Sequence, residues 1–160
     1  MALRTILQDG DETLRKKSKK VTDFNERLHT LLDDMRETLL AANGLGLAAP
    51  QVGVLRRVVL VIDDEDNVIE LINPEIVSTE GEVEDAEGCL SFPGLYGLVV
   101  RPERVTVKAQ DRNGNEFTAS GEGMTARCFC HEVDHLNGEL FTDKVVRYLD
   151  TKQETGEDGE

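Results

Sequence analysis

The chain has 160 residues, with 32 acidic against 18 basic side chains and a formal net charge of −14. This length suits one domain with a hydrophobic core, and the acidic balance argues against nucleic acid or an anionic membrane as the main partner. The longest apolar run, near 58–62, is too short to span a membrane, and the first ten residues lack the pattern of a signal peptide. An odd number of cysteines, three, favours a reducing cytoplasm over a disulfide framework.

The first half of the chain predicts one helix followed by short strands. Thr22 or Asp23 is the expected N-cap of a helix that ends near Asn43 and has apolar residues at helical spacing, namely Leu28, Leu31, Leu32, Met35 and Leu39. His29 lies on that helix off the apolar stripe, so we expect it to be solvated. The strands are expected over 57–62, 68–73 and 75–83, with a turn at 63–67.

The second half predicts a hairpin and a second helix. Asn113-Gly114 is typical of the turn between two paired strands, here 99–110 and 116–120. Residues 123–137 predict a helix that Gly138 ends, and a last strand or short helix follows over 140–148. This order of elements predicts an α+β fold in which antiparallel sheets pack around the helix at 123–137.

No linker or internal repeat divides the chain. We therefore expect one catalytic domain over 1–150, followed by an acidic and disordered tail at 151–160.

His131-Glu132-Val133-Asp134-His135 is an H-E-x-x-H motif and contains two of the three histidines in the chain. Residues four apart share one face of a helix, so both histidines can bind one metal ion. Glu132 is then placed to take a proton from water at the metal, and Asp134 to orient a ligand histidine. The simpler alternative is a pair of surface histidines, with a solvated Asp134, on an ordinary amphipathic helix.

A catalytic metal site usually needs a third protein ligand, and the cysteines are the candidates. Cys128 shares the helix face of His135, but seven residues span roughly 10 Å along the axis, so one straight helix can hardly bring three ligands to one ion. Cys128 is therefore expected in a pocket wall, and Cys130 points off the ligand face. Cys89 lies in a separate segment, 87–94, that contains flexible glycines, and it is the predicted third ligand.

Residues 44–51, Gly-Leu-Gly-Leu-Ala-Ala-Pro-Gln, form a loop of small and apolar residues after the first predicted helix. The two glycines permit close approach of the backbone to a ligand, and the Gln51 amide can donate to a developing oxyanion. The commoner meaning of such glycines is a helix C-cap and a tight turn. No Lys-Ser/Thr pair follows, so the segment is not a phosphate-binding loop.

Taken together, segments 44–51, 87–91 and 131–135 closely resemble the three signatures of peptide deformylases, in the order of that family. The resemblance implies hydrolysis of the N-formyl group from the N-terminal formylmethionine of newly synthesised polypeptides, with release of formate. It also implies one divalent metal ion bound by Cys89, and by His131 and His135. Fe(II) is the usual metal of the family, although such ligands also accept Zn(II), Ni(II) or Co(II).

The resemblance assigns further roles. Gln51 and the backbone N–H of Leu90 would stabilise the oxyanion together with the metal, and Glu132 would return its proton to the departing amine. Glu87 and Arg101 would form a buried pair behind the cysteine strand. The methionine pocket would be lined by Gly44, Leu45, Gly46, Met124 and Cys128, although these residues could equally be ordinary core.

Two features outside these signatures also bear on partners. Arg127 is expected at the pocket rim, where it would meet the substrate or Glu84 and Asp85. The tail at 151–160 carries Lys152 against four acidic residues, which argues against docking on ribosomes through a basic C-terminal helix.

Two alternatives remain open at this stage. One is an H-E-x-x-H peptidase that cuts internal peptide bonds, which would not require the 44–51 loop or Cys89. The other is a non-catalytic protein of the same fold that keeps the metal. Loss of Glu132, of Gln51 or of a ligand would favour that second alternative, and all of these residues are present.

Overall fold

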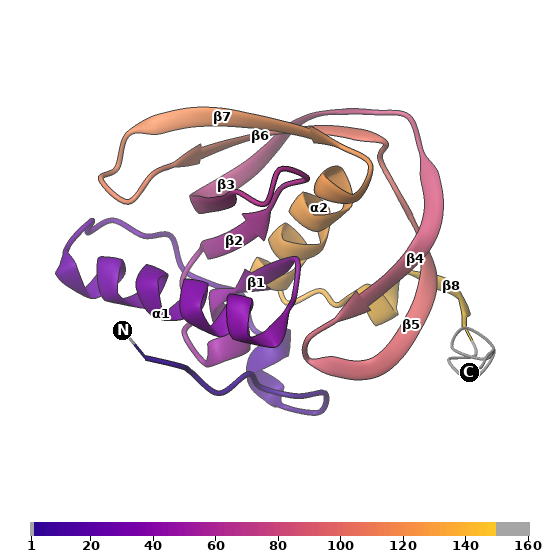
Figure 1. The fold of residues 1–160 in the computed structure, drawn as a ribbon, viewed down its shortest axis with the longest axis horizontal. Helices are drawn as coiled ribbons and strands as arrows, with labels where there is room; N and C mark the ends of the chain where they lie inside the picture. Colours follow the sequence, from indigo (N-terminus) through magenta and orange to yellow (C-terminus); the bar gives the residue numbers. More distant parts are fainter. Residues whose placement is uncertain (1, 150–160) are drawn as a thin grey trace.

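The computed structural model describes residues 2–149 (Figure 1). This part contains helices α1 (Glu26–Ala42) and α2 (Met124–Leu136) and two antiparallel sheets. One sheet has the strand order β1 (Gly46–Ala48), β2 (Val58–Ile62), β3 (Val68–Glu80), β6 (Arg104–Gln110) and β7 (Glu116–Glu122). The other has the order β4 (Val83–Cys89), β5 (Phe92–Arg101) and β8 (Val145–Tyr148). The predicted α+β class, with antiparallel sheets around the second helix, is confirmed.

Strand β2 is buried on both faces, which explains why its sequence is apolar throughout. Val58 and Leu60 pack in one hydrophobic cluster with the apolar stripe of α1. Val59 and Val61 pack in another cluster with Ala126 and other residues of α2. Because side chains alternate along a strand, the two helices cover opposite faces of the five-stranded sheet. Helix α2 thus lies in the interior, between this sheet and the strands β4 and β5 (Figure 1).

Helix α1 begins later than predicted. Asn25, rather than Thr22 or Asp23, is the N-cap, and its side chain accepts a hydrogen bond of 3.1 Å from the backbone N–H of Leu28. His29 is half-buried rather than solvated, because its Nε2 lies 2.7 Å from the carbonyl oxygen of Arg112 in the turn between β6 and β7.

The strand boundaries differ from the prediction in two places. Segments 68–73 and 75–83 were expected as separate strands, but β3 runs on to Glu80, with a register irregularity between Ile72 and Glu75 that bends the strand without ending it. Conversely, the segment 99–110 was expected as one strand, and the structure divides it between β5 and β6.

The predicted hairpin is present as β6 and β7. Gly114 adopts the left-handed conformation at φ 87° in its turn. The Asp111 carboxylate accepts hydrogen bonds from the backbone N–H groups of Asn113 and Asn115, at 2.9 and 3.0 Å. These contacts explain why the turn forms at this point in the chain.

The C-terminal elements follow the prediction closely. Helix α2 begins after Gly123, and Gly138 adopts a left-handed conformation just beyond its end. Residues 140–148 were expected to form a strand or a short helix, and they contain one of each, a short 3₁₀ helix at Phe141–Asp143 and strand β8. The predicted disordered tail at 151–160 lies outside the described residues. Within them, no helix is long and apolar enough to cross a membrane.

Candidate active site and metal centre

The three predicted metal ligands come together from two elements. Cys89 ends strand β4, and His131 and His135 lie one turn apart on α2. Their ligand atoms all lie within 4.8 Å of one another, and the Cys89 Sγ is 3.4 Å from the His135 Nε2. The Nδ1 of His131 is hydrogen-bonded to Glu87, so the Nε2 of His131 remains available as a metal ligand. One thiolate and two imidazoles of this kind form a donor set for a divalent transition metal.

Glu87 holds His131 from behind. Its Oε2 lies 2.6 Å from the His131 Nδ1, and Arg101 donates to both of its oxygens, at 3.0 and 2.7 Å. Burial alone raises the pKa of the Glu87 carboxyl, but the hydrogen bonds from His131 and Arg101 outweigh burial and lower this pKa to about 2. Glu87 is therefore a carboxylate at neutral pH, and it directs the other ring nitrogen of His131 towards the site.

The sequence analysis predicts that Asp134 orients a ligand histidine, but the structure shows no direct contact of this kind within the residues it describes. The Asp134 carboxylate accepts a hydrogen bond of 2.7 Å from Arg101, and no hydrogen bond joins it to a histidine among residues 2–149. Asp134 therefore supports the metal ligands only through Arg101 and Glu87.

Arg127 contributes to the wall of the cavity beside the ligands, but it is buried rather than placed at an exposed rim near Glu84 and Asp85. Its guanidinium is buried and donates to Glu87 Oε1 at 3.1 Å. It also donates to the carbonyl oxygens of Val83 and Val99, at 2.9 and 2.8 Å. Arg127 thus ties α2 to β4 and β5, a structural role that the sequence analysis missed. The only signal in the sequence was its place one helical turn before His131.

Glu132 lies beside the ligands in the same cavity. Its carboxylate is buried, and burial raises the pKa of this group to about 7. The Oε1 has no hydrogen-bond partner in the described part of the chain, which is unusual for a buried carboxylate oxygen outside a functional site. The Oε2 packs against Gly46, where an added Cβ would come within 2.5 Å of it. Only glycine at position 46 leaves room for the carboxylate in this place.

The Gln51 side chain is fixed at both ends of its amide. Its Oε1 accepts a hydrogen bond of 2.9 Å from the backbone N–H of Ala48. Its Nε2 donates to the Ser91 Oγ at 3.1 Å and lies 3.6 Å from the Cys89 Sγ. The donor end of the amide therefore faces the metal ligands. The sequence analysis gave Ser91 no role, although this residue belongs to the 87–91 segment.

A cavity of about 520 Å³ opens beside the ligands. Its walls include all five residues predicted for the methionine pocket, together with the predicted catalytic residues; these are Gly44, Leu45, Gly46, Met124, Cys128, Gln51, Leu90 and Glu132. Leu45 and Met124 are each 48% exposed, so they form its outer part rather than the core. Burial raises the pKa of the Cys128 thiol to about 12, which keeps the thiol neutral and suits an apolar wall. Cys130 packs away from the cavity, in the core cluster of α2.

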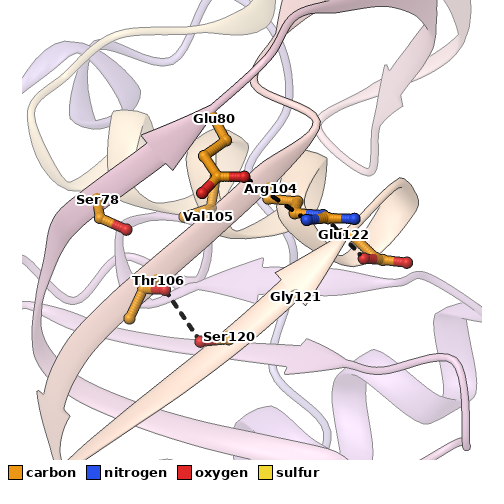
Figure 2. A pocket seen from close by; sticks show the side chains of 8 residues that line it. All are labelled: Ser78, Glu80, Arg104, Val105, Thr106, Ser120, Gly121 and Glu122. Atoms are coloured by element: carbon orange, nitrogen blue, oxygen red, sulfur yellow. Dashed lines mark hydrogen bonds and ion pairs between the residues drawn. The ribbon is translucent and has the colours of Figure 1, made fainter.

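A second hollow lies over β3, β6 and β7 (Figure 2). The exposed Arg104 pairs there with Glu80 at 3.6 Å and Glu122 at 3.2 Å, and Thr106 and Ser120 share a hydrogen bond of 3.0 Å. These are surface contacts between neighbouring strands. None of the residues predicted for the site lies in this hollow, so the chemistry belongs to the cavity beside α2.

Metal-donor atoms that converge beside a buried carboxylate of raised pKa are typical of the active site of a metal-dependent hydrolase. The model of the polypeptide deformylase family matches residues 3–150. A peptide deformylase of Acetivibrio thermocellus is 62% identical over 150 residues, which cover 94% of this chain and 88% of that protein. One of Caldicellulosiruptor bescii is 58% identical over 153 residues, covering 96% and 92% respectively. The chain belongs to the peptide deformylase family.

Solved structures agree with this assignment. The crystal structure of a peptide deformylase from Legionella pneumophila has a TM-score of 0.86 and 52% identity, with 89% of this chain and 86% of that chain covered. That of the Thermotoga maritima enzyme also has a TM-score of 0.86, with 40% identity and coverage of 89% and 97%. The expected activity is thereby confirmed: the chain is a metal-dependent amide hydrolase that removes the N-formyl group from N-terminal formylmethionine.

Proposed function

We propose that deformylation takes place in the cavity beside α2, at one divalent ion bound by Cys89, His131 and His135. The observation that carries this assignment is the convergence of these ligand atoms within 4.8 Å, next to the unpartnered Glu132 Oε1. The formyl group of the substrate would lie at the inner end of the cavity, and the rest of the peptide would leave through its open side.

The chemistry divides between the ion and the residues around it. A bound divalent ion supplies Lewis acidity and lowers the pKa of water to about 7. Glu132 accepts the proton of the attacking water and later passes it to the amine nitrogen as the C–N bond of the formamide breaks. The Gln51 amide and the backbone N–H of Leu90 donate to the oxyanion that develops on the formyl oxygen. Glu87, with Arg101 and Asp134 behind it, keeps His131 in position.

Methionine specificity is assigned to the walls of the same cavity. Leu45, Met124 and Cys128 offer apolar surface to the methionine side chain. Gly44 and Gly46 leave the space that the formylated N-terminus and Glu132 require. Met124 would contribute flexible thioether surface, which suits an unbranched side chain.

Fe(II) is proposed as the native metal. A site with one thiolate and two imidazoles also accepts Zn(II), Ni(II) and Co(II), so these ions should bind to the same three ligands. Metal content after anaerobic purification, followed by the activity of each metal form, tests the choice.

The proposed substrates in the cell are formylmethionyl nascent polypeptides, and the proposed place is the cytoplasm. Residues 151–160 carry one basic residue against four acidic residues, a composition that disfavours docking on ribosomes through a basic helix in this segment. The net charge of −14 argues against nucleic acid or an anionic membrane as the substrate.

Three synthetic peptides test the assignment. The first is a formyl-Met tripeptide, the second is its acetyl-Met counterpart, and the third is a longer peptide with a blocked N-terminus. We expect formate release from the first and negligible hydrolysis of the other two. Cleavage inside the third peptide would instead favour a peptidase, and no turnover by a fully metal-loaded protein would favour a non-catalytic metal protein.

A further inference from the structure

Basic side chains are unevenly distributed in this acidic protein. Lys16, Lys17, Lys19 and Lys20 are four of the seven lysines in the chain, and all four are exposed. Arg27, in the first turn of α1, and Arg56, in the loop before β2, are also exposed. We call these six residues the basic face.

The cations of the basic face form no close ion pairs in the part of the chain that the structure describes. Most other exposed cations are paired, as Arg104 is with Glu80 and Glu122, and Lys108 with Glu116. None of the six has a carboxylate oxygen within 4.0 Å in the part of the chain that the structure describes, and Arg147 is the only other exposed cation of that part of which this is true. The six cations therefore differ from most other exposed cations, although the chain has 32 acidic residues.

The backbone that carries the lysines is fixed. Lys19 forms an isolated parallel bridge with Arg56, in which its N–H donates to the Leu55 carbonyl at 3.0 Å and its carbonyl accepts from Arg57 at 2.9 Å. On either side, Ser18 donates to the carbonyl of Leu136 at 2.8 Å, and Val21 donates to the Asn73 side chain at 2.8 Å. The lysine segment therefore lies beside the loop that carries Arg56.

The two arginines continue the same face. Arg27 and Arg56 line one cavity of about 260 Å³, together with Arg4 and Asp23. Arg4 is already paired with Asp34 at 2.8 Å, so Asp23 is the acidic group that remains near these two cations. The balance of charge around this cavity is positive.

The basic face is separate from the catalytic cavity. None of its six residues lines that cavity, and its backbone is joined to the C-terminal end of α2 through Leu136. A partner bound to the basic face therefore contacts residues other than those that line the cavity.

We propose that the basic face binds the phosphate backbone of structured RNA. Lys16 and Lys20 can be up to roughly 13 Å apart on an extended chain, a length over which a duplex presents several phosphates. Four of the six cations are lysines, which are point charges without planar or aromatic surface for reading bases, so binding should depend little on sequence. A membrane is a poorer fit, because none of the exposed large apolar side chains lies in the segment 15–20 to enter a bilayer.

The net charge of the protein affects where on its surface RNA can bind. The net charge is −14, so the rest of the surface repels a polyanion and the basic face is the favoured point of approach for RNA. If the proposed function is correct, the substrates emerge from a particle rich in structured RNA. The basic face would then hold the enzyme close to its substrates.

The test is fluorescence anisotropy of a labelled RNA hairpin with the metal-loaded protein in 50–200 mM KCl. With three or four phosphates contacted, the slope of log K against log salt should be about −3. The triple variant Lys17→Ala/Lys20→Ala/Arg56→Ala should weaken binding at least about tenfold. The control Arg104→Ala/Lys108→Ala/Arg147→Ala removes the same charge from exposed cations outside the basic face, and it should change binding less than about twofold.

Three results would overturn the proposal. These are absence of RNA binding at 50 mM KCl, equal weakening by both triple variants, or binding of the wild-type protein to phosphatidylserine vesicles but not to RNA. Both variants should hydrolyse a free formyl-Met peptide at the wild-type rate, which shows that they are folded. This assay also separates failure of the RNA proposal from failure of the proposed function, since it uses no RNA.

Discussion

Glu87 on β4 and His131 on α2 are 44 residues apart in the chain, and their side chains meet at 2.6 Å. The contact joins the three-stranded sheet to the central helix at the point where the metal ligands converge. Arg101 and Arg127 both donate to the same carboxylate, so one buried anion fixes a ligand histidine and holds a strand against the helix.

Glu87→Gln should weaken metal binding about 10–100-fold. The amide keeps the shape of the side chain but loses the charge that pairs with Arg101 and favours the Nδ1–H form of His131. Competition with a chromophoric chelator measures the affinity. The matched control is Glu84→Gln, an exposed position on the same strand, which should bind metal normally. Equal affinity in both variants would contradict the role of Glu87.

Cys89→Ala should lose bound metal and activity, whereas Cys130→Ser should keep both. Cys89 supplies the third ligand, and the Cys130 thiol packs in the core, where burial raises its pKa to about 11. Metal analysis by mass spectrometry, run beside formate release, distinguishes the two variants. Full metal content and activity in Cys89→Ala would remove Cys89 from the ligand set and bring Cys128 back as a candidate.

Gly46→Ala should reduce activity much more than Gly44→Ala. A Cβ at position 46 comes within 2.5 Å of the Glu132 Oε2 and displaces the proposed proton carrier. A Cβ at position 44 meets the end of the Leu90 side chain at 2.7 Å, and a flexible side chain can move away. We expect a loss of about 10²-fold or more in kcat for Gly46→Ala, in the range of positioned proton transfer. Comparable kcat values in the two variants would show that the close packing at position 46 has no catalytic importance.

The iron form should lose activity quickly in air, and the zinc form should not. The Cys89 thiolate is half-buried at the edge of an open cavity, so oxygen or peroxide can reach both the Fe(II) and the sulfur. Zn(II) has no redox chemistry, and Co(II) or Ni(II) forms should be nearly as active as fresh iron enzyme and last longer. Mass spectrometry of Cys89 during air exposure, beside activity, tests this. An iron enzyme that stays fully active for days with an unmodified Cys89 would count against it.

The parts of the site that depend on local spacing were predictable from the sequence. His131 and His135 share a face because they are four residues apart on a helix, and Gly138 ends that helix where expected. Cys89 could be inferred as the third ligand from helix geometry, because Cys128 lies too far from His135 along their common helix. The hairpin at Gly114 follows equally from local turn chemistry.

The parts that depend on packing between distant segments were not predictable in this way. Nothing near Arg127 in the sequence indicates that it donates to the carbonyl oxygens of Val83 and Val99. Asp134 lies in the motif, yet its partner is Arg101 on another element. Strand β3 continues beyond Ile72 because its pairing with β6 resumes after an irregularity, and sequence patterns do not show that pairing.

The most direct test of the account compares Glu132→Gln with the wild-type enzyme, both loaded anaerobically with Fe(II). Metal content and formate release from a formyl-Met tripeptide are measured on the same samples. The substitution leaves the three ligands in place and removes the group that carries the proton. We predict one metal ion per chain in both proteins and a fall of about 10²–10⁴-fold in kcat for the variant. Near-full turnover by a metal-loaded Glu132→Gln enzyme would contradict the account.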